Sequence, residues 1–277
     1  MARAPFFLYV PPTCYASPNV YLHAECLLLM PCIRTAVIPA AGLGRRLRPL
    51  TDSRPKCLVE VDGVPLLERT IHALEQNGFE RLVLITGYRA EDIRKFIACH
   101  NTSLQVETVH SARYDVTNNI YSLWQARTCV DEAFVLIESD LIFEPSALAP
   151  FTQPNRIALE AFDPMLHSGS TVVLGNENRA THMYVEEAPP HNETLYKTVN
   201  IYSFSASTWS KIRTIIARRI DNGRVNCYHE AALAELVDAR AVSMEAVDFS
   251  DMWWDEIDTP EDLDRVKHEL QQAFSGS

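Results

Sequence analysis

Short apolar runs alternate along the chain with longer stretches in which apolar residues recur every three or four positions. The first run, Thr35–Pro39, predicts a buried strand that ends at a glycine loop. In Val64–Asn77, apolar residues share one helical face and Gly78 follows as a stop signal, so we expect an amphipathic helix. The alternation continues with expected strands at Arg81–Thr86, Gln105–Val109 and Ala133–Glu138 and expected helices at Glu91–His100 and Asn119–Arg127.

This alternation predicts an α/β fold, a Rossmann-like and mostly parallel mixed sheet with helices on both faces. Ligands of such sheets bind beyond the carboxyl ends of the strands. Three predicted strand ends carry candidate binding residues: the glycine loop, Gly87-Tyr88 and Ser139-Asp140. We therefore expect these three segments to meet in one crevice.

Beyond Pro145 the apolar runs become shorter, which predicts a small extension of the sheet that is mixed or antiparallel. The expected strands are Ile157–Ala161, Thr171–Leu174, His182–Glu187, Lys197–Phe204 and Ala241–Phe249. The expected helices are Ser207–Arg219, Tyr228–Val237 and a last helix that Thr259 caps and Pro260 begins. These elements predict one domain over residues 33–277, preceded by an irregular N-terminal extension over residues 1–32.

The composition matters mainly for the partners that it excludes. A formal net charge of −11 over 277 residues argues against a nucleic-acid partner, because a nucleic-acid backbone requires a basic surface. The seven cysteines contain no Cys-x-x-Cys pair, so neither a zinc site nor a disulfide framework is indicated. No apolar run approaches the length of a membrane span, and we expect a cytoplasmic protein without a membrane partner.

The most specific chemical signal is a glycine loop that follows the first strand and precedes two cationic side chains. Gly42 and Gly44 let the backbone approach a ligand closely, and successive backbone N–H groups in such a loop bind anions. Arg46 and Lys56 add positive charge beside the loop. These residues predict a cradle for a polyphosphate. The dinucleotide fingerprint and the Walker A loop fit worse, since the first needs a third glycine and the second ends in Gly-Lys-Ser/Thr.

The pattern Gly-x-Gly-x-Arg-Leu followed by Pro-Lys resembles the nucleotidyltransferase family, which joins a nucleoside triphosphate to a phosphorylated small molecule. Residues 42–47 and Pro55-Lys56 carry this resemblance. It implies in-line attack of an ionised acceptor oxygen on the α-phosphorus, with Arg46, Lys56, Asp140 and Asp258 as catalytic residues. The residues expected to bind the nucleotide are Ala40, Ala41, Gly42, Gly44, Arg45, Gly87, Thr117 and Asn118.

Two acidic segments indicate a metal ion beside the polyphosphate. Asp140 follows a hydrophobic strand, and Glu256 and Asp258 alternate in an extended segment, where both carboxylates face the same side. Magnesium prefers one or two carboxylates together with water and phosphate oxygens. We therefore expect Mg²⁺ to bind Asp140 and Asp258, with Glu256 as a third ligand. The alternative is a strand-end acid and a helix-capping cluster, both facing solvent.

Further segments resemble the cytidylyltransferase branch of the family. Asn118-Asn119 followed by Tyr121-Ser122-Leu123 is similar to phosphocholine cytidylyltransferases, and Glu138–Ile142 and Trp254–Asp258 resemble the enzymes for 2-aminoethylphosphonate. The resemblance implies CTP as the nucleotide. It implies 2-aminoethylphosphonate, 2-hydroxyethylphosphonate or phosphocholine as the acceptor, and it leaves a homodimer open.

Four residues are candidates for the acceptor site. Glu230, with Tyr228 beside it in sequence, is the candidate for a cationic headgroup, although it could equally be an exposed helix acid. Lys197 is the candidate for the acceptor phosphoryl group, and Trp254 belongs to the second acidic segment. Two other functions stay open: a sugar-1-phosphate nucleotidyltransferase that uses UTP or dTTP, and a non-catalytic nucleotide sensor on the same fold.

Overall fold

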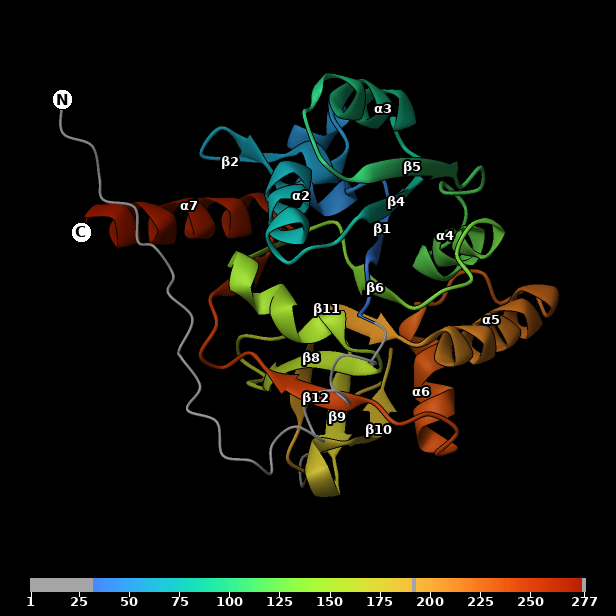
Figure 1. Ribbon diagram of the computed structural model, residues 1–277. Helices are drawn as coiled ribbons and strands as arrows, with labels where there is room; N and C mark the ends of the chain where they lie inside the picture. The colour runs from blue at the N-terminus through green and yellow to red at the C-terminus, as the bar shows by residue number, and fades with distance from the viewer. Residues whose placement is uncertain (1–31, 191–192, 276–277) are drawn as a thin grey trace, which may run out of the picture. The chain divides into compact units, whose positions relative to one another are not determined.

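The computed structural model describes residues 32–190 and 193–275 (Figure 1). Residues 32–277 cluster as one compact unit. The predicted N-terminal extension lies outside the described residues, apart from Cys32. Within the described part of the chain, no helix is both long enough and apolar enough to cross a membrane.

Four parallel strands form one half of the central sheet, in the order β6-β1-β4-β5. The central strands are β1 (Thr35–Ala40) and β4 (Arg81–Thr86), and the flanking strands are β5 (Gln105–His110) and β6 (Phe134–Ile137). The sequence predicted each of them to within one residue at either end. Because the four strands run in one direction, their carboxyl ends meet at one edge of the sheet.

Helices cover both faces of this half of the sheet, as predicted. Ala36 and Ile38 of β1 belong to the core cluster that contains α2 (Leu66–Gln76), whereas Val37 belongs to the cluster that contains α4 (Asn119–Gln125). This alternation follows from the two-residue period of a strand. The other covering helices are α3 (Ala90–Cys99), which joins the α2 cluster, and α5 (Ala206–Asp221) and α6 (Glu230–Asp238), which join the α4 cluster.

The other half of the sheet begins where β11 (Tyr196–Phe204) pairs antiparallel with β6. The strands that continue it are β8 (Arg156–Ala161), β9 (Thr171–Leu174), β10 (Ala180–Tyr184) and β12 (Glu245–Asp248). β12 pairs with β8 in parallel, so the extension is mixed, which is one of the two arrangements that the sequence allowed. Among the described residues, these strands and the parallel half form one nine-stranded sheet.

Two predicted strands were too long, and local turns explain both errors. The strand expected over Ala241–Phe249 starts only at Glu245, because the N–H of Ala241 still bonds to the carbonyl of Leu236 at the end of α6. The strand expected over His182–Glu187 ends at Tyr184, and Glu186 has a left-handed φ of 62°.

A second, small layer joins segments far apart in sequence. β7 (Leu141–Phe143) pairs antiparallel with β13 (Trp254–Glu256), and the N–H of Ile257 bonds to the carbonyl of Asp140 at 3.0 Å. The sequence did not predict these three-residue strands, which are too short to show a period.

The remaining elements are short. β2 (Glu60–Val61) and β3 (Val64–Pro65) form a hairpin. The described residues also contain six 3-10 helices: η1 Arg45–Leu47, η2 Leu50–Asp52, η3 Lys56–Leu58, η4 Ala126–Thr128, η5 Pro145–Thr152 and η6 Asn176–Asn178.

The last helix, α7 (Pro260–Ser275), begins as predicted. Thr259 Oγ1 accepts a hydrogen bond from the N–H of Asp262 at 3.2 Å, and Asp262 Oδ2 accepts one from the N–H of Thr259 at 2.8 Å. This reciprocal cap satisfies backbone donors at the start of the helix and fixes the direction in which the chain leaves β13.

Candidate active site

The glycine loop follows β1, and its conformation depends on Gly44 and Thr51. Gly44 has a left-handed φ of 59°, and a Cβ atom there would lie 2.9 Å from Thr51 Cγ2. Thr51 Oγ1 also donates a hydrogen bond to the carbonyl of Gly44 at 2.7 Å. Leu47, where the dinucleotide fingerprint has a glycine, is fully buried in a cluster with Ile142 and Ile257, so it anchors the loop to the β7–β13 layer.

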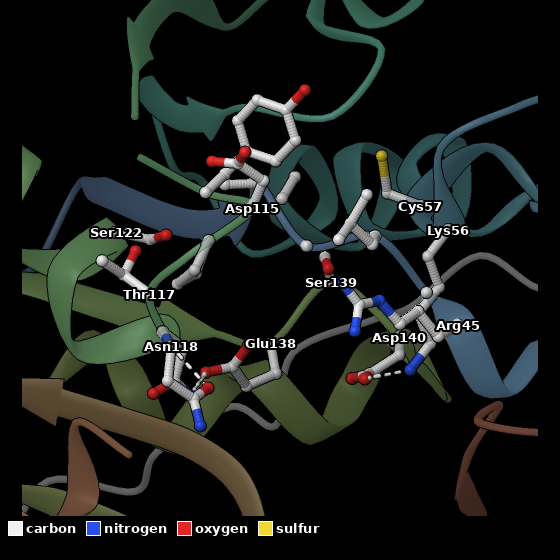
Figure 2. Close-up of a pocket in the computed structure, with 18 of the residues that line it drawn as sticks. Arg45, Lys56, Cys57, Asp115, Thr117, Asn118, Ser122, Glu138, Ser139 and Asp140 are labelled. Carbon is white, nitrogen blue, oxygen red and sulfur yellow. Dashed lines mark hydrogen bonds and ion pairs between the residues drawn. The ribbon is translucent and has the colours of Figure 1, made fainter. Parts of the chain in front are cut away.

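Lys56 lies between the two carboxylates that the sequence assigned to a metal. Its Nζ is 2.6 Å from Asp140 Oδ2 (Figure 2). It also contacts Asp258 Oδ1, while Nη2 of Arg46 is 2.8 Å from Asp258 Oδ2. Burial lowers the pKa of Lys56, but the two carboxylates outweigh burial and raise it to about 12. Burial likewise opposes ionisation of Asp140, and Lys56 nevertheless holds its pKa below the usual value. All four residues proposed as catalytic therefore meet in one ion-pair network.

A divalent cation fits this network, although only two of the three predicted ligands converge. The oxygens of Asp140 and Asp258 meet at one ammonium group, and two hard oxygen ligands suit Mg²⁺ when phosphate oxygens complete its shell. Glu256 turns instead toward Lys197 and Asn200. Accordingly, the described residues contain no cluster of three or more His, Cys, Asp or Glu side chains that could hold a metal ion.

The segment after β5 returns to the same edge of the sheet. Asn118 caps α4, since its Oδ1 accepts a hydrogen bond from the N–H of Asn119 at 2.8 Å. The Asn119 side chain links two other elements: its Oδ1 accepts from the N–H of His229, and its Nδ2 lies 3.3 Å from Glu138 Oε1. Asn118 thus caps α4, and Asn119 connects the end of β6 with the start of α6.

Two adjoining cavities open at the carboxyl ends of the parallel strands. The first cavity measures about 790 Å³ and is lined by the glycine loop and by the segment after β5. The second cavity measures about 400 Å³ and lies between β11, α6 and β13. The residues that line both cavities are Arg46, Asn119, Glu138, Asp140, Tyr228 and Asp258. The catalytic network therefore forms part of the wall that the two cavities share.

Most of the predicted binding residues line one of the two cavities. Those in the first cavity are Ala40, Ala41, Gly42, Gly44, Arg45, Thr117 and Asn118, and those in the second cavity are Lys197, Tyr228 and Glu230. Gly87 lines neither cavity. A Cβ atom on Gly87 would lie 2.7 Å from Tyr114 Cβ and 2.8 Å from the carbonyl oxygen of Ala41, so this glycine permits close packing behind the loop. Trp254 also lines neither cavity and packs against the core cluster of α2.

An acidic group of buried side chains lies at the shared wall. His229 Nδ1 is 3.1 Å from Glu230 Oε2 and 3.4 Å from Glu138 Oε1. Neither of these two contacts is a hydrogen bond. Both ring nitrogens of His229 and Oε2 of Glu230 lack a hydrogen-bond partner within the described structure. Burial raises the pKa of Glu138 well above its usual value, as do Asp140 and Glu230, while burial lowers the pKa of His229. Glu230 is therefore buried and not the exposed helix acid of the alternative interpretation.

Three residues of this site were not predicted from the sequence. Glu138 stands directly before the predicted Ser139-Asp140, and His229 stands between Tyr228 and Glu230. Asn200 lies inside β11, where asparagine is an unfavourable residue for a strand. That mismatch was the available sequence signal, whereas the proximity of Glu138 and His229 depends on long-range contacts, among them the hydrogen bonds of Asn119 to both residues.

Comparison with known proteins agrees with this geometry. Residues 36–155 match the model of the MobA-like NTP transferase domain. The CMP-5'-(3-aminopropyl)phosphonate synthase of Streptomyces rubellomurinus is 30% identical over 237 residues, which cover 82% of this chain and 37% of that protein. The 2-aminoethylphosphonate cytidylyltransferase of Lancefieldella rimae is 37% identical over 117 residues, which cover 40% of this chain and 46% of that protein. The chain thus spans less than half the length of these two curated relatives.

A solved structure shows the same fold. The CTP:phosphocholine cytidylyltransferase of Streptococcus pneumoniae superposes with a TM-score of 0.69 at 23% identity, over 86% of this chain and all of that one. The central sheet therefore has the fold of the nucleotidyltransferases. Residues 36–155 carry the MobA-like NTP transferase domain, and the homologues of the chain include proteins named as cytidylyltransferases.

Proposed function

We propose that this protein transfers CMP from CTP to a small phosphonate or phosphorylated alcohol and releases pyrophosphate. The shared wall of the two cavities gives the strongest support, because a transfer reaction needs two ligands that meet at one charged group. The first cavity would hold CTP with its phosphates on the glycine loop. The second cavity would hold the acceptor.

The transfer is an in-line displacement in which positioning and charge neutralisation supply most of the rate. An oxygen of the acceptor bonds to the α-phosphorus, and the bond from that phosphorus to the β-bridging oxygen breaks, with its electron pair leaving on pyrophosphate. The attacking oxygen is already ionised, so no general base is required. Arg46 would contact the β- and γ-phosphates, and Lys56 would contact the α-phosphate, where charge accumulates.

In the ligand-free protein, both cationic side chains neutralise the acidic pair. Asp140 and Asp258 would hold Mg²⁺, which neutralises phosphate charge when it is bound. Arg46 and Lys56 would exchange these carboxylates for phosphate oxygens of the nucleotide. The relatives named above suggest the same substrates, since their names describe CMP transfer to aminoalkylphosphonates and to phosphocholine.

The lining of the second cavity favours an acceptor that carries an ammonium group. The cavity lining contains two cations, Arg46 and Lys197, and one aromatic ring, that of Tyr228. Seven carboxyl side chains also line this cavity: Glu138, Asp140, Glu186, Glu187, Glu230, Glu256 and Asp258. A primary ammonium group has three N–H donors for such carboxylates, whereas a trimethylammonium group is bound mainly by aromatic faces. Among the predicted acceptors, 2-aminoethylphosphonate therefore fits best.

Pyrophosphate release tests the proposal directly. The protein would be assayed with magnesium and each of the four nucleoside triphosphates, with 2-aminoethylphosphonate, 2-hydroxyethylphosphonate, phosphocholine and glucose-1-phosphate as acceptors. We expect turnover with CTP and the aminophosphonate. Turnover with UTP or dTTP and the sugar phosphate would replace the proposal with the sugar-1-phosphate alternative. Tight CTP binding without any turnover would support a nucleotide sensor instead.

A further inference from the structure

Asn200 holds a backbone conformation that is unusual in the middle of a strand. Its φ is 62°, in the left-handed region, and the pairing of β11 with β8 shifts register between Thr198 and Tyr202. Bulges of this kind re-aim a side chain, and they are frequent beside active sites. Among side chains other than glycine, asparagine tolerates this conformation best. The bulge directs the Asn200 side chain to the wall of the second cavity.

The hydrogen bonds of Asn200 fix the orientation of its amide. Its Oδ1 accepts hydrogen bonds from Thr198 Oγ1 at 3.0 Å and from the Tyr202 hydroxyl at 3.3 Å. Its Nδ2 donates to Glu256 Oε1 at 2.5 Å. A flipped amide would place its oxygen against a carboxylate, so only this orientation satisfies all the partners.

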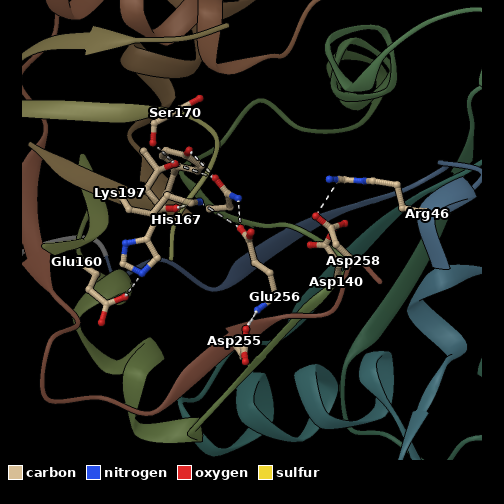
Figure 3. A network of polar contacts seen from close by, with 12 residues as sticks. Arg46, Asp140, Glu160, His167, Ser170, Lys197, Asp255, Glu256 and Asp258 are labelled. Carbon is tan, nitrogen blue, oxygen red and sulfur yellow. Dashed lines mark hydrogen bonds and ion pairs between the residues drawn. The ribbon is translucent and has the colours of Figure 1, made fainter. Parts of the chain in front are cut away.

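Glu256 is thereby held on the acceptor side of the shared wall (Figure 3). Its Oε1 lies 3.4 Å from Lys197 Nζ, which also donates to the carbonyl of Thr198 at 2.5 Å. Asp258, two residues later, pairs instead with Arg46. Lys197 itself is only 3% exposed, yet it lines the second cavity. Asn200 thus connects a buried ammonium and a carboxylate at one place on the cavity wall.

We propose that Asn200 is a positioning residue for the acceptor. It holds Glu256 beside Lys197, so that the pair offers a carboxylate to the cationic end of a zwitterionic acceptor and an ammonium to its phosphoryl end. This inference rests on the proposed function, because it assumes that the second cavity binds the acceptor. It also assigns Glu256 to the acceptor and not to the metal, in contrast to the expectation from the sequence.

Two substitutions separate the backbone conformation from the amide. Asn200→Gly keeps the left-handed φ and removes the side chain. Asn200→Asp keeps a side chain that tolerates this φ but places a second negative charge against Glu256. The matched control is Asn178→Gly, since Asn178 also has a positive φ, of 53°, is exposed, and lines neither cavity.

Calorimetric titration with 2-aminoethylphosphonate and, separately, with CTP is the deciding measurement. We expect both Asn200 variants to bind the aminophosphonate about ten-fold more weakly than the unsubstituted protein, because a charge-assisted hydrogen bond is lost. CTP affinity should stay within about two-fold, because the side-chain hydrogen bonds of Asn200 reach no residue that lines the first cavity. Asn178→Gly should change neither affinity.

Several results would overturn the inference. These are an unchanged aminophosphonate affinity in both Asn200 variants, a parallel loss of CTP affinity, and an unsubstituted protein that binds no aminophosphonate. Pyrophosphate release by the unsubstituted protein is measured in parallel with the titrations, and it tests the proposed function. A protein that binds the aminophosphonate but never releases pyrophosphate would contradict the proposed function, while the titrations would still decide the role of Asn200.

Discussion

The two cavities are built in different ways. The first cavity is lined largely by two continuous segments, Pro39–Arg46 and Tyr114–Asn119, each of which follows a parallel strand. The second cavity collects residues from β11, α6, β13 and two loops, so neighbours on its wall are far apart in sequence. A continuous segment can keep its shape while the rest of the fold changes. A wall made of scattered residues can instead change its ligand through single substitutions.

Their electrostatics differ as well. At the shared wall, Lys56 and Arg46 pair with Asp140 and Asp258, so two positive and two negative charges balance locally. Beside this network, Glu138 and Glu230 lie next to the buried His229, and both ring nitrogens of His229 and Oε2 of Glu230 have no hydrogen-bond partner within the described structure. Unsatisfied buried groups of this kind cost stability and are typical of a site that a ligand completes. The second cavity is therefore where ligand identity should matter most.

The largest expected effect on activity comes from substitution of Lys56, which contacts both Asp140 and Asp258. Lys56→Met should lower kcat for CMP transfer by about 10²–10³-fold, because a cation at the α-phosphate is lost. Without nucleotide, Mn²⁺ should bind this variant more tightly than the unsubstituted protein, since no ammonium competes for Asp140 and Asp258. Steady-state kinetics and metal titration measure the two effects. Lys95→Met, on the exposed face of α3, is the control, and a kcat within about ten-fold would contradict the assignment.

The next effect should be confined to the second cavity. Glu230→Gln should raise KM for 2-aminoethylphosphonate by about ten-fold, because a carboxylate that pairs with the ammonium group is lost. KM for 2-hydroxyethylphosphonate should not rise, since that acceptor has no cation. The exposed Glu261→Gln is the matched control. Equal increases for both acceptors would show that Glu230 does not recognise charge.

A pair of glycine substitutions should separate packing from ligand binding at the first cavity. Gly87→Ala should lower the free energy of unfolding by about 1–3 kcal/mol, because its Cβ would overlap Tyr114 and the carbonyl of Ala41. Gly42→Ala should leave stability unchanged, since no atom lies within 4 Å of its added Cβ, but it should raise KM for CTP. Urea unfolding and kinetics distinguish these outcomes. Equal stability losses in both variants would mean that Gly42 is also a packing residue.

The smallest effect concerns the pH dependence of stability. Burial raises the pKa of Glu138, so the folded state retains a proton that the unfolded state releases above its usual pKa of 4.5. The contribution of Glu138 to stability therefore falls as pH rises from this value through the folded pKa. Asp140, whose pKa is lowered, contributes in the opposite sense and loses its stabilisation as pH falls below 3.8. Glu138→Gln should make the decrease above pH 4.5 shallower in urea unfolding, and an unchanged slope would refute this.

The sequence predicted the parallel half of the fold best. Arg81–Thr86 was predicted to the residue, because a fully buried strand between a glycine stop and Gly87 gives a clear local signal. The three-residue strands β7 and β13 were missed, since so short an element shows no period. Their pairing explains why Asp140 and Asp258 come together, and the sequence could suggest that proximity only through a family resemblance.

For the predicted acceptor residues too, the sequence indicated the residue types but not all of their contacts. Glu230 and Lys197 were singled out by residue type and position, but Glu256 was expected beside Asp258. The alternation of an extended strand predicts that these two carboxylates share a side. The chain leaves β13 at Glu256, however, and Asn200 draws that side chain to the acceptor side.

The sequence by itself determined the parallel α/β frame, the glycine loop and the identity of the cationic and acidic residues. These depend on local periodicity and on short motifs, which can be read directly from the order of the residues. The tertiary structure alone decided which carboxylates face Lys56 and which face Lys197. It also decided that Gly87 and Trp254 lie outside both cavities, and that Glu138, His229 and Glu230 share a buried wall. Those outcomes depend on long-range strand pairing and helix packing, which bring together residues that no local pattern connects.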